Sequence, residues 1–310
     1  MNNLKKVGLT ALGTALVATS ATAADYSISG TSQVTFMGQD NNNTGNGWTM
    51  SDSISFSASG EMDNGMTVSH IYEVDGGGQG NYHVKVDTGS FGTITFVGGS
   101  ETGVIGSWDD LTPTANEEAH GVTVGGTVAG AANGTANTTN IFKYSYNIGD
   151  GIDFSAAYSP SEGTAIVESS IDYGIKYTGM EGLTVYAAMG ENNDSSNGVD
   201  NSALSVSYAM GGLTIGYQVN ESDYSTGTKD EDFTAIGVSY AVSDDLSVSL
   251  NSSTIDFEST SLDDQEATGV SFSYTSGGMT ISGAHSNIDN VGGTSTTDNS
   301  GYELNFKFAF

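Results

Sequence analysis

The fold is decided by residues 202–220, which read SALSVSYAMGGLTIGYQVN. From Leu204 to Tyr208 every second residue is large and apolar, and the residues between them are serines. An alternation with a period of two is typical of a β-strand that has one apolar and one polar face. The Gly211-Gly212 link to the next alternating segment predicts a tight antiparallel hairpin.

The same unit repeats along the chain in both directions, bounded by clusters of Gly, Asn, Asp and Ser. Links after even-numbered strands are short turns, whereas links after odd-numbered strands have about 6 to 12 polar and acidic residues. One long link, residues 99–139, has about 41. An all-β antiparallel meander with two different ends is therefore expected. We predict sixteen strands, over residues 26–38, 49–60, 66–74, 81–88, 91–98, 140–148, 152–159, 170–177, 183–190, 202–209, 213–220, 232–240, 246–255, 267–275, 279–286 and 299–310.

Composition excludes several classes of protein. The 310 residues include 43 Gly but neither Cys nor Arg, and the formal net charge is −30. The lack of Cys removes disulfide scaffolds, Cys-ligated metals and thiol catalysis. A chain this acidic lacks the basic surface that phosphate binding needs, so no nucleic-acid partner is expected. No motif of a common hydrolase, metalloprotease or nucleotide-binding site is present, and we predict that the protein is not an enzyme.

The first 23 residues have the pattern of a secretory signal peptide. Lys5 and Lys6 precede an apolar stretch over residues 7–18, and Ala21-Thr22-Ala23 is a small-x-small cleavage site. Cleavage would remove two lysines and leave a single domain, residues 24–310, with a net charge of −32. No later apolar run approaches the 18 residues of a membrane-spanning helix.

Alternation alone fits two architectures, because a soluble sandwich buries its apolar faces and a membrane barrel turns them outward. Three features favour a transmembrane barrel. The strands are close to the 9 to 11 residues that cross a bilayer, and aromatic residues recur on their apolar faces. Their number is even, which places both termini at one end of a barrel. The sequence also stops within a strand, on Phe310.

Three segments carry a resemblance to a known family. Residues 305–310, NFKFAF, resemble the last strand of outer-membrane barrels, whose terminal Phe is read by the barrel-assembly machinery. Residues 88–98, TGSFGTITFVG, and 25–30, DYSISG, resemble Rhodobacter-type general diffusion porins of Gram-negative bacteria. The resemblance implies an up-and-down barrel of sixteen strands, assembled as a homotrimer in outer-membrane lipid. It also implies that the third loop, residues 99–139, folds inward and narrows a channel for small hydrophilic solutes.

The resemblance also points to the residues of a constriction. Such porins set an arginine-rich wall against acidic residues of the third loop, but in this chain only lysine can oppose them. The strand lysines alternate with apolar residues, so their side chains face the polar side of the strand. A lysine in a membrane strand must face water in any case, whether or not it takes part in a constriction. Both interpretations stay open for Lys85 and Lys143. The candidate constriction residues are Glu101, Asp109, Asp110, Glu117, Glu118, Lys85 and Lys143.

No cofactor is expected, and only calcium has candidate ligands. Two acidic clusters in the longer links could hold it through carboxylate oxygens, although solvated loop charge explains them equally simply. The four histidines lack the spacing of metal ligands. The candidate calcium ligands are Asp230, Glu231, Asp232, Asp263 and Asp264.

These observations favour an outer-membrane porin, with an exported surface adhesin or binding protein of all-β fold as the alternative. Most of the 37 acidic residues lie in the longer links, and only Lys229 among the mature lysines does so. The third loop adds carboxylates where the channel is expected to narrow. Fixed negative charge concentrates cations, so the sequence predicts a cation-selective channel.

Overall fold

A computed structural model describes residues 25–40, 46–99, 101–122, 139–161, 168–194 and 198–310. The predicted signal peptide and part of the third loop lie outside these residues. Within them, no helix is long and apolar enough to cross a membrane.

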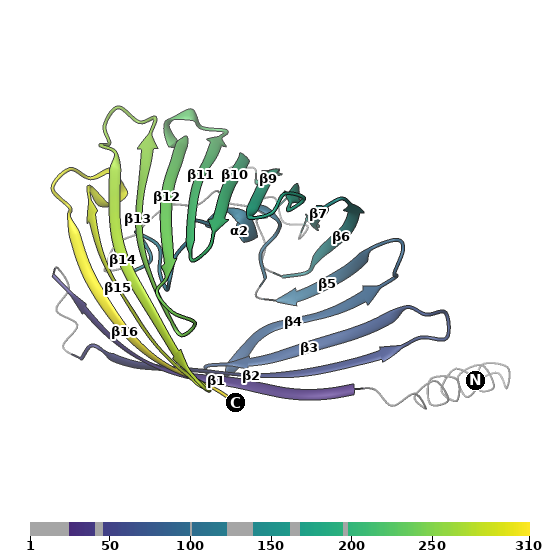
Figure 1. Ribbon diagram of the computed structural model, residues 1–310. Helices are drawn as coiled ribbons and strands as arrows, with labels where there is room; N and C mark the ends of the chain where they lie inside the picture. Colours follow the sequence, from purple (N-terminus) through teal and green to yellow (C-terminus); the bar gives the residue numbers. More distant parts are fainter. Residues whose placement is uncertain (1–24, 41–45, 100, 123–138, 162–167, 195–197) are drawn as a thin grey trace.

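Sixteen antiparallel strands form one closed barrel, in which each strand pairs with its neighbours in sequence and β1 pairs with β16 (Figure 1). This confirms the predicted strand number and fold. The strands are β1 Asp25–Gln39, β2 Trp48–Glu61, β3 Thr67–Asp75, β4 Gly78–Asp87, β5 Thr93–Gly99, β6 Ile141–Gly149, β7 Ile152–Ser159, β8 Ser170–Tyr177, β9 Leu183–Asn192, β10 Val199–Met210, β11 Leu213–Tyr224, β12 Glu231–Ala241, β13 Leu246–Phe257, β14 Gln265–Ser276, β15 Met279–Asp289 and β16 Asn299–Ala309. Short helical turns are α2 Ile105–Trp108, η2 Gly227–Lys229 and η3 Val291–Gly293.

The barrel turns its apolar faces outward. Tyr217 on β11 is 50% exposed and Leu250 on β13 is 63% exposed, whereas the alternate residues Gln218 and Asn251 are buried inside. A continuous outer surface of this kind is far larger than the apolar patches that soluble monomers expose. The alternation therefore describes a membrane barrel, and the sandwich that the sequence left open is excluded.

Carboxylates mark where the apolar band ends on one side of the barrel. Glu221, Asp232 and Asp256 share the outward face of β11 to β13 and lie directly opposite one another across the strands. On each of these strands the carboxylate lies beyond the apolar outward-facing residues, at the end nearest the longer links. Because a charge near the bilayer midplane is costly, this acidic row lies outside the hydrocarbon region.

One predicted link differs from the structure. The β3–β4 connection was expected to take about six residues, but the strands extend until only Gly76 and Gly77 join them. Both glycines have positive φ, 55° and 82°, which suits a two-residue hairpin turn. The glycine-rich segment between these strands is therefore a two-residue turn that joins longer strands, and not a loop.

The barrel closes where Phe310 meets β1. The backbone N–H of Gly30 donates to the Phe310 carbonyl at 2.8 Å, and the Phe310 N–H donates to the Gly30 carbonyl at 3.0 Å. A Cβ on Gly30 would lie 2.6 Å from the Phe310 ring, so the ring covers the space that glycine leaves. Phe310 thus continues the β1–β16 ladder.

Candidate functional site: the loop inside the barrel

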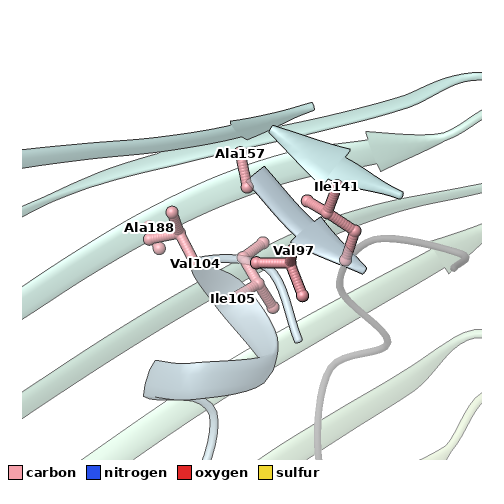
Figure 2. Packing of buried hydrophobic residues seen from close by; sticks show 6 residues of the cluster. All are labelled: Val97, Val104, Ile105, Ile141, Ala157 and Ala188. Atoms are coloured by element: carbon pink, nitrogen blue, oxygen red, sulfur yellow. The ribbon is translucent and has the colours of Figure 1, made fainter. Parts of the chain in front are cut away.

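The third loop enters the barrel over an apolar anchor. Val104 and Ile105, at the start of α2, pack on inward-facing residues of four strands (Figure 2). Ile105 is fully buried, and Trp108 packs against the same cluster. The strand residues of the cluster are Val97 on β5, Ile141 on β6, Ala157 on β7 and Ala188 on β9. The inner wall of the barrel, which is polar elsewhere, is therefore apolar at the point where the third loop begins.

Polar wall residues hold the next part of the loop. The Ile105 N–H donates to Asp172 Oδ2 on β8 at 3.2 Å, and the Trp108 ring meets Tyr186 edge-on at 5.2 Å. The Gln218 side chain on β11 accepts from the Leu111 N–H at 2.7 Å and donates to the Trp108 carbonyl at 3.1 Å. Each bond satisfies a buried polar group that would otherwise cost free energy.

The loop then crosses β13, β14 and β16. The Asn251 amide donates to the Pro113 carbonyl at 3.0 Å, and Ser249 Oγ accepts from the Ala115 N–H at 3.0 Å. The Asn116 N–H donates to Ser271 Oγ at 3.0 Å, and its side chain donates to Glu303 Oε1 at 2.9 Å. The loop therefore lies along the inside of the wall, as the family resemblance implied.

Four of the predicted constriction carboxylates gather in this segment. Burial raises the pKa of Asp109 to about 7, and the neighbouring charge of Asp110 acts in the same direction. Burial also raises the pKa of Glu117 to about 7, with the charges of Glu303 and Glu118 adding to the shift. The pKa of Glu118 is raised by burial and by Asp110. At neutral pH the cluster therefore carries less than four negative charges.

His120 lies against this cluster. Its Nε2 is 3.4 Å from Asp110 Oδ2, and its ring packs edge-on against Phe233. Burial would lower the His120 pKa, but the hydrogen bond and charge of Asp110 and the charges of Glu118 and Glu117 outweigh it. The net shift is upward, so protonated His120 offsets part of the acidic charge.

Glu101, the fifth predicted carboxylate, lies apart from the others at the root of the loop. Its Oε1 accepts from Asn81 Nδ2 and lies 2.8 Å from His83 Nδ1, and its Oε2 is 3.3 Å from Lys143 Nζ. Lys143 also donates to the Thr102 carbonyl at 3.1 Å. Burial would raise the Glu101 pKa, but the Asn81 bond and the Lys143 and His83 charges hold it below its ordinary value.

The lysines thus differ in their surroundings. Lys143 is paired with the loop, while Lys176 lies 5.5 Å above the Tyr186 ring. Lys85 shares the inner face of β4 with His83 and makes no ion pair within the described part of the chain. The structure does not bring Lys85 and Lys143 together with the four-carboxylate cluster as one charged ring.

The calcium candidates are not assembled into a site. Asp230 Oδ1 accepts from the Tyr224 N–H at 2.7 Å, which closes the β11–β12 loop. Among the residues that the structure describes, no group of three or more His, Asp or Glu side chains is placed to hold a metal ion. Of the five candidates, Asp230, Asp263 and Asp264 lie in links between strands, whereas Glu231 and Asp232 belong to β12.

Sequence reasoning missed the wall residues that receive the loop. Gln218 and Asn251 lie on the polar face of their strands, but nothing in the alternation distinguishes a loop partner from a residue facing water. A detectable signal was glycine at inward positions of strands, since glycine in a strand often marks a close backbone approach. Gly174, Gly216, Gly237 and Gly269 all lie under the loop.

The Glu101–Lys143 pair makes a prediction for channel selectivity. Lys143→Gln removes a positive charge from the lumen and should increase cation preference, while Glu101→Gln should decrease it. Because the charges are 3.3 Å apart and compensate each other, the double variant should return close to the parent. Reversal potentials of the four proteins in a KCl gradient test this. A double variant that keeps the shift of either single variant would contradict this compensation.

A closed barrel with an apolar exterior, a polar interior and a loop folded against its inner wall defines a transmembrane channel protein. The chain matches the Gram-negative porin family over residues 8–261 and belongs to that family. It is an outer-membrane porin of a Gram-negative bacterium. The comparison with curated proteins found no match.

Solved porin structures share the fold at low sequence identity. An anion-selective porin from Comamonas acidovorans has a TM-score of 0.71 at 13% identity, covering 93% of this chain and 100% of its own. The trimer form of OmpT from Vibrio cholerae gives 0.67 at 15%, with 93% and 100% covered. A triple mutant of Rhodopseudomonas blastica porin gives 0.64 at 15%, with 92% and 100% covered.

Proposed function

We propose that the protein is a passive, non-enzymatic channel that lets small hydrophilic solutes cross the outer membrane and that prefers cations. The observation that carries this is the inward loop, which lies along one side of a sixteen-stranded barrel. A barrel of this size leaves an aqueous lumen rather than a packed core. The alternative, an adhesin or binding protein, gives no reason for a polar interior partly filled by a loop.

The charge inside the barrel favours cations. Inward-facing Asp87, Asp153, Asp172 and Glu303 match the four strand lysines in number, and Glu101, which pairs with Lys143, adds one further carboxylate. The four-carboxylate cluster, opposed locally by His120, adds further negative charge, as does Glu73 on the inner face of β3. The Comamonas porin shares this fold and is anion-selective, so the fold alone does not confer a preference for cations. Selectivity must therefore come from these side chains.

The wall away from the loop is lined by hydroxyl groups instead of arginine. Inward positions of β1 and β2 are mainly Ser and Thr, and Ser27 Oγ is 2.6 Å from Ser57 Oγ. Neutral hydroxyls add no positive charge against the loop carboxylates. Hydrated cations and uncharged polar solutes are thus the proposed permeants.

The proposed assembly is a homotrimer, a state also recorded for the Vibrio porin. On β1 and β2 the outward face includes the small residues Gly30, Ser32, Ala58 and Gly60 among larger apolar ones. Small residues suit contact with another protomer. We place the interface on the early strands. Export through cleavage after residue 23, and insertion by the barrel-assembly machinery reading Phe310, complete the proposal.

A planar-bilayer measurement tests the function. The purified oligomer should form open channels whose reversal potential in a tenfold KCl gradient has the sign of cation selectivity. Screening shortens electrostatic reach from about 10 Å at 0.1 M to about 3 Å at 1 M, so the preference should fade with salt. Neutralising Asp109, Asp110, Glu117 and Glu118 together should remove most of it. An anion-selective parent, or an unaffected variant, would contradict the cation proposal.

A further inference from the structure

We propose that a row of four wall residues, Gly216, Gly237, Asn251 and Gly269, is a built seat that fixes the third loop and thereby sets the open cross-section of the channel. This inference rests on the proposed channel function and names the residues that position its narrowest part. They touch the loop backbone and act on permeation only through it.

The four residues form one continuous row across β11 to β14. Gly216 pairs directly with Gly237, Gly237 with Asn251, and Asn251 with Gly269. All lie on the inward face. In an antiparallel sheet directly paired residues stand side by side on the same face, so three missing side chains produce a shallow track in the wall.

The loop occupies this track at van der Waals range. A Cβ on Gly216 would collide with the ring of Pro113, and one on Gly237 would lie 2.8 Å from the Pro113 carbonyl oxygen. A Cβ on Gly269 would lie 2.7 Å from the Cα of Ala119. These contacts are with backbone or a rigid ring, which cannot move aside as a flexible side chain would.

Asn251 supplies the polar part of the seat. Its amide donates to the Pro113 carbonyl at 3.0 Å, and a Cβ on Gly237 would lie 2.5 Å from the same amide nitrogen. Glycine at position 237 therefore makes room both for Pro113 and for the side chain that holds it. Proline has a fixed φ, so clamping one residue fixes the direction of the loop on both sides.

A side chain added to the seat should push the loop toward the axis of the barrel. Gly237→Val is expected to lower single-channel conductance on the order of tens of per cent, because added volume in a packed contact forces backbone shifts. Valine is favoured over glycine in strands, so a role confined to the strand predicts no such loss. The matched control is Gly78→Val, at a strand glycine outside the proposed trimer interface, where the added Cβ would meet only the Asp75 carbonyl oxygen at an ordinary 3.5 Å.

A cross-link provides the second measurement if Gly237→Val fails to fold. The chain has no cysteine, so Ala115→Cys with Ser249→Cys can place a disulfide across the existing contact, where Ser249 Oγ is 3.0 Å from the Ala115 N–H. If the loop is already seated, conductance should be the same before and after reduction. Equal conductance in folded Gly237→Val and the parent, or a rise when the cross-link is reduced, would overturn the seat. A parent that forms no channels would instead overturn the proposed function.

Discussion

Replacing residues 109–119 by a short Gly-Ser linker is expected to raise single-channel conductance by roughly twofold, because a sixteen-stranded barrel encloses an aqueous channel that this segment partly fills. The segment contacts β11, β13, β14 and β16 from inside, so its removal enlarges the lumen without removing any strand. The measurement is conductance in planar bilayers, together with the permeation of uncharged solutes of increasing size.

The control for this change is a deletion of similar kind outside the lumen. Shortening the connection between β13 and β14, residues 258–264, should leave conductance close to that of the parent. Oligomers on unheated gels would show that each variant has folded. If the linker variant folds and conducts like the parent, the loop lies outside the conduction path.

Cation preference is expected to fall steeply when the pH is lowered from about 8.5 to 5.5. The pKa values of Asp109 and Glu117 are raised to about 7, so both carboxyls are charged at the upper pH and neutral at the lower one. The pKa of His120 is also raised, so its positive charge is present at the acidic end. Lowering the pH therefore removes the negative charges of Asp109 and Glu117, while the positive charge of His120 is kept or gained. The reversal potential in a KCl gradient should follow this change.

A double variant isolates the two carboxyls. Asp109→Asn with Glu117→Gln should flatten the pH dependence between 6 and 8 and leave a weaker, nearly constant cation preference. Glu61→Gln with Asp63→Asn removes the same formal charge at the opposite end of the barrel and should keep the parental profile. A pH profile unchanged by the first pair would assign the titration to other groups.

Most of the barrel could be predicted because its rule is local. Alternation is imposed by strand geometry, and residues such as Leu204 and Tyr208 show it without reference to distant parts of the chain. The rule fails where the loop meets the wall. Val97 and Ile141 face inward although they are apolar, because they receive Val104 and Ile105 rather than water. That contact joins segments whose pairing the alternation does not encode.

The candidate site was predicted by residue type but not by arrangement. Counting charge treated five loop carboxylates as one group, whereas Glu101 lies with Lys143 and the other four share His120. His83 and His120 were considered only as metal ligands, and their carboxylate partners were missed because these lie on another element or a turn of the loop away. Ionisation of Asp109 and Glu117 depends on burial, which becomes known only when the loop is placed.

The β1–β16 ladder has a consequence for how the protein reaches its native state. Fifteen of the sixteen pairings join strands that follow one another in sequence, but Thr31 pairs with Ala309, almost the whole chain away. The entropic cost of bringing the first and last strands together rises only slowly with chain length. No β1–β16 contact can offset this cost, however, until the last strand has been made. Closure of the barrel must then follow synthesis of β16, and the unpaired edge of β1 has to be protected from aggregation meanwhile.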